Sequence, residues 1–384
     1  TAAVVSLTLV AGTTTAANAV EKMKWKMLRE AIVGLKQVLK LSTAAVVSLT
    51  LVAGTTTAAN AVEKMKWKMQ SAFGSKLSVI GEVAKRFEGV IKDSSGGAMQ
   101  MKFFEPGALV PVLQGWDAVK AGSIDAMWGT SGYHVGKIPA LAFFSAVPFG
   151  PRAGELLAWM HYGGGNEIYG RIVGENGMVG KHCAAIAPET SGWFRKKYNS
   201  VEELKGLKMR FFGLGAVVMT KLGVSTQLLP GADIYPALER GVIDATEFSM
   251  PSIDYDLGFY QIAKFNYYPG WHQQSSLGEL LMNKKGWDGL SKQQQSIISS
   301  ACGDAVTWSF VRSEGKQFEA MNKLKAKGVT NVRWSDADLA KMEAAWNEVV
   351  AEETAKDPLW NEVYQSYSSF RAKYKVWKDN GYLN

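Results

Sequence analysis

Strand-like and helix-like segments alternate along the middle of this chain, and this alternation limits the fold more than any other feature of the sequence. The strand-like segments "AMQMKFF" and "SIDAMWG" flank a helical pattern over 110–122. The same order recurs over 207–248, where "LKMRFFG", "STQLLPG" and "VIDATEF" are separated by helical patterns. Because parallel strands need long crossover connections, this order predicts an α/β fold with mostly parallel sheets.

A short internal repeat divides the pattern into two similar halves. "AVKAGSIDAMW" at 118–128 matches "ALERGVIDATE" at 237–247 in register, and Gly122 and Gly241 stand where each helix should end. The second copy closes at Glu247, directly after its strand. Ligands of open α/β sheets bind outside the carboxyl ends of the strands. We therefore expect two α/β lobes that face each other across a cleft.

The first 69 residues contain a repeat of another kind. The segment "TAAVVSLTLVAGTTTAANAVEKMKWKM" occurs letter for letter at 1–27 and at 43–69. The second copy, preceded by the basic segment 28–42, reads as a secretory signal whose small-x-small cleavage site ends at Ala61. We therefore expect residues 1–61 to lie outside the fold, with cleavage after Ala61. The alternative is an N-terminal hairpin of two apolar segments.

Composition narrows the class of protein further. Without residues 1–61 the chain keeps 37 Lys and Arg against 33 Asp and Glu, so its net charge is +4. No later apolar run is long enough to span a membrane, and no basic stripe with interleaved aromatics indicates nucleic-acid binding. These features predict an exported, soluble periplasmic protein. For Cys183 and Cys302 we expect two buried free thiols rather than a disulfide.

Common catalytic motifs are missing from the sequence. It contains no G-x-S-x-G, no H-E-x-x-H and no phosphate-binding G-x-x-x-x-G-K, and its four histidines show no metal-binding spacing. Binding without catalysis is therefore the leading prediction.

Arg210 is the most informative residue, because it lies in an apolar strand where a buried guanidinium needs an anionic partner. That partner is either an internal carboxylate or the carboxylate of a ligand. Glu189 and Glu247 could hold a hard cation through oxygen ligands, or each could be solvated or paired with a basic residue. Four aromatic residues are candidates either for the cleft wall or for the core: Tyr133, Trp193, Phe248 and Trp271.

Several longer motifs resemble one protein family. "SVEELKGLKMR" and "LLPGADIYPALERGVIDATEF" are similar to the periplasmic solute-binding subunits of tripartite ATP-independent periplasmic (TRAP) transporters, the DctP-type family, and the resemblance runs from about Met65 to the C-terminus. A likeness to the branch that binds 2-oxo acids and related monocarboxylates rests on "FFSAVPFGPRAGELLAWMHYGGG", "SGWFRKKYN" and "FYQIAKFNYYPGWHQQ".

The resemblance implies a fold with two α/β lobes joined by strands that cross between them and close on the ligand. It places lobe 1 at 62–186 with part of 274–334, lobe 2 at 187–273, and a long helical C-terminal segment at 335–384. In this branch that segment holds homodimers together, so we expect it to be an interface.

The resemblance also assigns roles to single residues. Arg210 would bind the ligand's carboxylate, and Tyr133 would reach the ligand. A bridging sodium or calcium ion would be held by Glu247, by the backbone carbonyl of Phe248, where Trp is usual, and by Glu189, where Gln is usual. The full set of predicted ligand-binding residues is Arg210, Tyr133, Glu189, Trp193 and Trp271.

The predicted function is capture of a small 2-oxo or 2-hydroxy monocarboxylate outside the cytoplasm and delivery to the membrane subunits of a TRAP transporter. Two alternatives stay open. One is a ligand sensor that docks on a receptor kinase, and the other is an exported enzyme that uses Glu189 and Glu247 as an acid/base pair.

Overall fold

The computed structural model describes residues 19–37 and 62–383. The chain divides into two units, 1–61 and 62–384. Of the first unit, the structure describes one helix over 19–37, whose side chains are exposed. The expected cleavage site at Ala61 and most of both repeat copies lie outside the described residues. Within the described residues, no helix combines the length and apolar character needed to cross a membrane.

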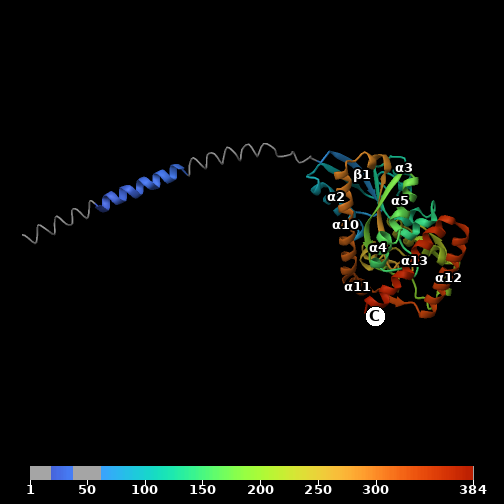
Figure 1. The fold of residues 1–384 in the computed structure, drawn as a ribbon. Coiled ribbons are helices and arrows are strands. Elements are labelled where there is room, and N and C mark those ends of the chain that lie inside the picture. Colours follow the sequence, from blue (N-terminus) through green and yellow to red (C-terminus); the bar gives the residue numbers. More distant parts are fainter. Residues whose placement is uncertain (1–18, 38–61, 384) are drawn as a thin grey trace, which may run out of the picture. The chain divides into compact units, whose positions relative to one another are not determined.

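The first lobe of the second unit is built on a five-stranded sheet (Figure 1). β1 pairs in parallel with β2 and β3, and β10 runs antiparallel to both β3 and β4. In spatial order the strands are β2 (Met99–Phe104), β1 (Met65–Ser71), β3 (Ala126–Gly129), β10 (Ser276–Asn283) and β4 (Met178–Ile186).

The second lobe is built on a six-stranded sheet. β6 pairs in parallel with β7 and β8, whereas β5 runs antiparallel to β8 and β9. In spatial order the strands are β11 (Thr330–Arg333), β9 (Phe265–Tyr268), β5 (Gly192–Phe194), β8 (Ala245–Thr246), β6 (Lys208–Arg210) and β7 (Ser225–Gln227). The α/β, two-lobed fold expected from the sequence is confirmed.

The chain passes between the two sheets three times: once through the helices α9–α11 between β10 and β11, and twice through short segments without helix or strand. Residues 187–191 join β4 to β5, and residues 269–275 join β9 back to β10. We call them the first and second crossing segments. They touch where Gly270 meets Glu189, since a Cβ added at Gly270 would lie 2.2 Å from the Glu189 carbonyl oxygen. Only glycine therefore permits this close approach.

Helices cover both lobes, and most pack next to the strand that precedes or follows them in the chain. Figure 1 shows α2 and α10 on one side of β1, with α3 and α5 on the other. In the first lobe the helices are α2 (Ile80–Ser94), α3 (Gly115–Lys120), α4 (Ala153–Tyr162), α5 (Gly165–Glu175), α9 (Lys284–Asp288) and α10 (Lys292–Gly315). Those of the second lobe are α6 (Gly213–Lys221), α7 (Gly231–Glu239), α8 (Pro251–Asp256) and α11 (Gln317–Ala326).

The two copies of the internal repeat have the same local structure, a helix that ends near a glycine and is followed by a strand. Gly122 follows α3 with a φ of 73°, and Gly241 follows α7 with a φ of 71°. Both angles lie in the left-handed region that glycine adopts at helix ends. Each glycine turns the chain into a strand, β3 or β8, that pairs in parallel with a neighbour in its sheet.

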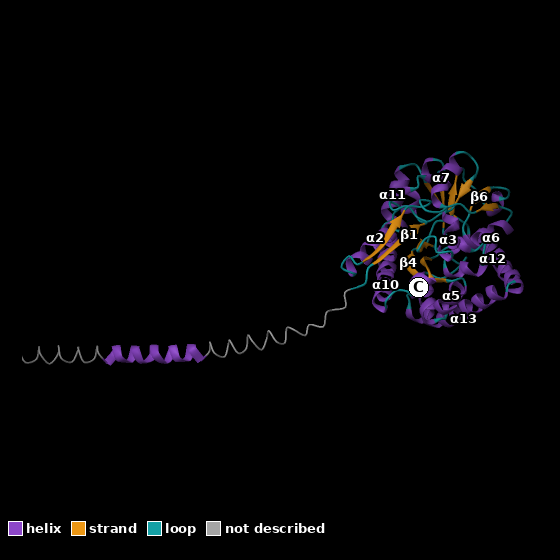
Figure 2. Ribbon diagram, turned by 90° about the horizontal axis from the view of Figure 1, so that it is seen from above, coloured by secondary structure: helices purple, strands orange, loops and turns teal. Residues whose placement is uncertain are grey.

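The C-terminal segment forms two helices, α12 (Asp336–Lys356) and α13 (Pro358–Gly381). α12 packs against α6 of the second lobe, and α13 packs against α4 and α5 of the first. Figure 2 shows this pair running along the outside of the molecule. The buried side chains of Trp360, Val363 and Tyr367 anchor α13.

The expectation of two free thiols was wrong. Cys183 in β4 and Cys302 in α10 form a disulfide although 119 residues separate them. α10 lies along β4, so the fold brings the two side chains together, and nothing in their sequence spacing indicates that contact. The bond ties the strand that leads into the first crossing segment to a helix on the outside of the sheet.

Candidate functional site

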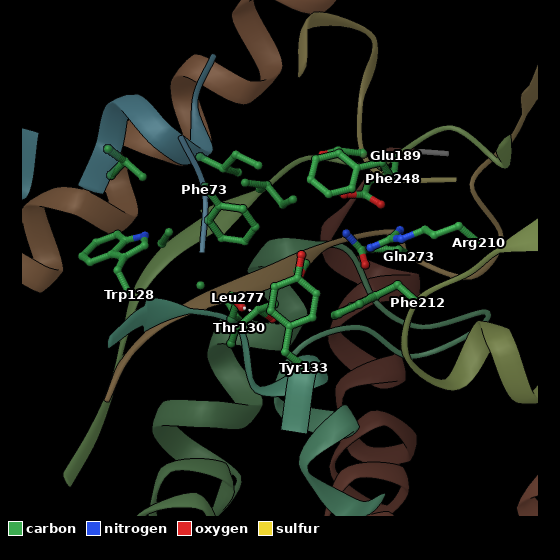
Figure 3. Close-up of a pocket in the computed structure, with 17 residues that line it drawn as sticks. Phe73, Trp128, Thr130, Tyr133, Glu189, Arg210, Phe212, Phe248, Gln273 and Leu277 are labelled. Carbon is green, nitrogen blue, oxygen red and sulfur yellow. Dashed lines mark hydrogen bonds between the residues drawn. The ribbon is translucent and has the colours of Figure 1, made fainter. Parts of the chain in front are cut away.

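A cavity of about 50 Å³ lies between the lobes and is lined by residues from both sheets and both crossing segments (Figure 3). Its first-lobe walls are largely apolar and include Phe73, Trp128 and Leu277. The side toward the second lobe carries Arg210 and Glu189, the two charged groups of the lining. The cavity thus has one charged end and one apolar end.

Arg210, the last residue of β6, is 1% exposed. Its Nη1 donates to Oε1 of Glu247 at 2.9 Å and to the Glu247 backbone oxygen at 2.7 Å, while Nε donates to the Leu229 carbonyl at 3.1 Å. The Phe248 ring lies 5.1 Å from the guanidinium carbon. The internal salt bridge is therefore present, and the guanidinium also lines the cavity.

Glu247 follows β8 and is fully buried. Its Oε1 accepts from Arg210 and from the Phe212 N–H at 2.6 Å, but its Oε2 has no hydrogen-bond partner. Burial raises the pKa of Glu247, but Arg210, His272 and the Phe212 N–H lower it by more, so the pKa ends below its usual value. One ionised oxygen is thus buried and free to bind.

The two crossing segments add Glu189 and His272 beside this oxygen. Nε2 of His272 lies 3.7 Å from Oε2 of Glu189 and 3.7 Å from Oε2 of Glu247. These separations are too long for hydrogen bonds, and all three atoms are buried without a partner. Among the described residues, this is the one group of His, Cys, Asp or Glu with the spacing of a metal site: its ligand atoms lie within 4.8 Å of one another.

The buried environment shifts the pKa values of both Glu189 and His272. Burial raises the pKa of Glu189 to about 7, despite the opposing effect of His272. Burial lowers the pKa of His272, but the two carboxylates outweigh it and raise that pKa to about 9. In the absence of a cation, a proton on His272 or Glu189 therefore compensates the buried negative charge.

Tyr133 reaches the cavity from the first lobe, on the short helical turn Ser131–His134. Its ring meets Phe212 edge-on at 5.5 Å. Burial raises the pKa of its hydroxyl to about 12, so the group is a neutral donor at neutral pH. Figure 3 shows this hydroxyl, the Gln273 amide and the Arg210 guanidinium turned toward the same space.

The structure does not bring every predicted residue to the cavity. Phe248 lines it, but Trp193 and Trp271 do not. Trp193 is fully buried and donates its indole N–H to Asp254 at 2.7 Å, whereas Trp271 stacks on Phe149 at 5.7 Å. Both are core residues next to the site. A buried indole N–H needs a hydrogen-bond partner, and for Trp193 that partner is Asp254 of the same lobe.

His272 is the site residue that sequence reasoning missed. In the sequence it stands beside Trp271 in the motif "YYPGWHQQ", which carries no metal-binding spacing. Its partners Glu189 and Glu247 lie 83 and 25 residues earlier in the chain, so no local spacing indicates the cluster.

Comparison with known proteins identifies the family. The model of the family described as "bacterial extracellular solute-binding protein, family 7" (DctP) matches residues 70–357. The chain belongs to this family. It is also 36% identical, over 77% of its length and 80% of the relative's, to a monocarboxylate 2-oxoacid-binding periplasmic protein of Nostoc sp..

Two solved structures of family members have the same fold. A TRAP solute-binding protein of Bordetella bronchiseptica, a dimer with calcium and picolinate in one active site, gives a TM-score of 0.80 at 30% identity and covers 82% of this chain and 94% of its own. One from Pseudoalteromonas atlantica, with bound sodium and pyruvate, gives 0.78 at 30% identity and covers 82% and 96%.

These findings confirm the expected family, the fold and a place outside the cytoplasm. This DctP-family chain is a periplasmic solute-binding protein of the TRAP type. Relatives hold small acids together with sodium or calcium.

Proposed function

We propose that this DctP-family protein binds a small 2-oxo or 2-hydroxy monocarboxylate together with sodium or calcium, and presents it to TRAP membrane subunits. The observation that carries the proposal is the free, buried Oε2 of Glu247 beside the Arg210 guanidinium. A cation and a carboxylate can both be satisfied there, whereas either alone leaves buried charge uncompensated.

Each residue of the site has a role in this proposal. Arg210 binds the ligand's carboxylate, and the Tyr133 hydroxyl donates to the ligand from the opposite lobe. The free oxygens of Glu189 and Glu247 hold the cation, assisted by the backbone carbonyl of Phe248. When bound, the cation turns repulsion between these carboxylates and the ligand's carboxylate into attraction.

The donor set fits a hard cation. Oxygens about 2.3–2.6 Å from a calcium ion lie up to about 5 Å apart. The free atoms of Glu189, Glu247 and His272 lie within 4.8 Å of one another, and the carboxylate oxygens lie 3.7 Å from Nε2 of His272. Two carboxylates, in place of one carboxylate and an amide, favour calcium over sodium.

The lining favours a ligand with a single carboxylate. Arg210 is the one cationic side chain among the residues that line the cavity, and its opposite end is formed by Phe73, Trp128 and Leu277. A second carboxylate would be buried against these apolar groups without a partner.

The site supports binding rather than catalysis. Arg210 and the Phe212 N–H lower the pKa of Glu247, and Arg210 occupies its Oε1, so Glu247 cannot act as a general acid. Its free oxygen faces Glu189 and His272 rather than the open cavity. We therefore propose that the protein is not an enzyme.

We also propose cleavage after Ala61 and the lobe boundaries 62–186 with part of 274–334 for lobe 1 and 187–273 for lobe 2, to which the structure adds α11 and β11 from the rest of 274–334. We propose that the end of α13 forms a homodimer interface, because exposed apolar side chains gather there: Val376, Trp377, Tyr382 and Leu383. Light scattering of Trp377→Glu against the unchanged protein tests the interface. If Trp377→Glu has the same molecular mass in solution as the unchanged protein, the proposed dimer interface is contradicted.

The function itself is tested by calorimetry. Pyruvate is titrated into protein dialysed against chelator in sodium-free buffer, and again after calcium or sodium is added. We expect binding only with a cation. Full-strength binding without either ion would refute the metal-bridged site, and no binding under any condition would refute the choice of acid.

A further inference from the structure

The three unpartnered atoms of the cation site come from three separate segments, and none belongs to the first sheet. Glu189 lies in the first crossing segment, His272 in the second, and Glu247 follows β8 of the second sheet. The first lobe contributes Tyr133 to the cavity but no atom to this group.

Backbone hydrogen bonds tie these three segments to one another. The Glu189 N–H donates to the Gln273 carbonyl at 3.2 Å, which links the two crossing segments. The Thr190 N–H donates to the Ser249 carbonyl at 3.2 Å, which links the first crossing segment to the residues that follow β8. The Glu247 N–H donates to the Arg210 carbonyl at 3.1 Å, which links those residues to β6 of the second sheet. The three side chains thus belong to segments that are hydrogen-bonded to one another, and we call these segments the framework.

Close packing supports this framework. Gly270 touches the Glu189 carbonyl with no room for a Cβ. Gly215 of α6 also packs closely, since an added Cβ would lie 2.6 Å from the Phe211 ring and 2.8 Å from the His272 Cβ. A framework without space for side-chain atoms has little freedom to rearrange. The first lobe also contacts the second crossing segment, where the Phe149 N–H donates to the Trp271 carbonyl at 2.7 Å. The positions of Glu189 and His272 therefore depend mainly on the two crossing segments and the second lobe.

Binding of the acid, unlike binding of the cation, requires residues from both lobes. Arg210 belongs to the second lobe, whereas Tyr133, Thr130 and Phe73 belong to the first. A ligand in the cavity must contact both lobes, and those contacts form only when the lobes close.

We infer that the cation binds first, to the acid-free protein, and that the acid binds second by bridging the preformed cation site to the first lobe. This inference rests on the proposed function. Its consequence is that the first lobe contributes to the affinity for the acid but not to the affinity for the cation. Because coupling between two ligands is reciprocal, the acid then tightens cation binding by the same factor by which the cation tightens acid binding.

The test is calorimetric titration of calcium, and separately of sodium, into chelator-dialysed protein that contains no acid. Two matched variants accompany it. Tyr133→Phe removes a first-lobe hydroxyl, and Glu189→Gln removes one charge but keeps an oxygen in the framework. Circular dichroism confirms that each variant is folded.

We expect a cation to bind the acid-free protein, with an affinity changed less than twofold by Tyr133→Phe and at least tenfold by Glu189→Gln. Pyruvate affinity measured at saturating cation should fall in Tyr133→Phe. Two results would overturn the inference: no cation binding until pyruvate is present, or equal loss of cation and pyruvate affinity in Tyr133→Phe. Failure of pyruvate to bind while the cation still binds would instead refute the proposed choice of acid.

A third variant separates positioning from general damage. His272→Gln should weaken cation binding by about tenfold, the size of effect seen when groups around a metal site are altered. Pyruvate affinity should return to within twofold of the unchanged protein once the cation is raised to saturation. A loss of pyruvate affinity that added cation does not restore would contradict a cation-site role for His272.

Discussion

Single buried polar atoms determine what this molecule can bind. Oε2 of Glu247, Oε2 of Glu189 and Nε2 of His272 are enclosed without partners, a costly state for polar groups in a protein interior. The neighbouring Arg210 satisfies only the other oxygen of Glu247. At the scale of residues, the site therefore keeps unpartnered polar atoms until a cation binds them, and the acid can bind after it.

Replacing Arg210 by lysine should weaken acid binding although the positive charge is kept. A lysine cannot make parallel bonds to a carboxylate while it also holds Glu247 and Leu229. The loss should be about 1.5–3 kcal/mol, or about ten- to a hundredfold in affinity for pyruvate measured by calorimetry. Arg240→Lys, at an exposed arginine of the same lobe, is the control and should change nothing.

Cation binding should strengthen as the pH rises from 6 to 8. The pKa of Glu189 is raised to about 7, so below that pH its carboxylate is largely protonated and a cation must displace the proton. Calcium titrations at pH 6, 7 and 8 measure the effect. Glu189→Gln should flatten the pH dependence, and an unchanged slope in that variant would point to His272 as the group that titrates.

At the scale of elements, the two crossing segments hold the site together. The glycine at 270 should not tolerate a side chain, because a Cβ would lie 2.2 Å from the Glu189 carbonyl. Gly270→Ala should lower the free energy of unfolding by about 1–3 kcal/mol, as overpacking does, and should also weaken cation binding. Gly136→Ala meets no atom within 4 Å and is the matched control for both measurements.

The Cys183–Cys302 bond joins β4 to α10 across 119 residues. Loss of a native disulfide typically costs about 2–5 kcal/mol of unfolding free energy. The double variant Cys183→Ser and Cys302→Ser should show such a loss in urea denaturation, and adding reductant should lower the unchanged protein to the same stability. Equal stability of both proteins without reductant would contradict a stabilising role.

Local patterns in the sequence predicted those parts of the fold and site that depend on local physics. Gly122 and Gly241 end helices because their backbone is left-handed there, and Arg210 and Glu247 close neighbouring strands of one sheet, as a repeated βα unit requires. The disulfide and His272 could not be predicted, because their partners are distant in sequence. Trp193 and Trp271 lie outside the cavity lining, and the sequence could not place them because indoles serve equally well in cores and in binding sites.

At the scale of the whole molecule, two lobes share one cavity and are linked by two short crossing segments and by the helices between β10 and β11. This arrangement is typical of hinge closure around a ligand. The radius of gyration from small-angle X-ray scattering should therefore fall when calcium and pyruvate are added to chelator-dialysed protein. Arg210→Lys at the same ligand concentrations should keep a value near that of the unliganded protein. An unchanged radius in the original protein would contradict closure.

The duplicated segment places the same residues in two different structures. "MKWKM" at 23–27 lies in a helix, whereas its second copy at 65–69 is part of β1, which lies between β2 and β3 in the first sheet. A chain that keeps both copies therefore has two identical segments that could occupy the position of β1 in the first sheet. Identity ends at Met69, and the next residue, Gln70, donates to the Val110 carbonyl and accepts from the Leu109 N–H.

The first copy continues instead with Leu28 and Arg29, which would lose these bonds and bury a charge where Ser71 is fully enclosed. It would also lengthen the connection from β1 to α2 from 8 residues (72–79) to 50 (30–79). By loop-closure entropy alone, that lengthening costs about 1.6 kcal/mol. The two residues that follow each copy and the length of the connection to α2 thus favour the second copy as β1. Removal of the first copy would leave only one segment able to form this strand.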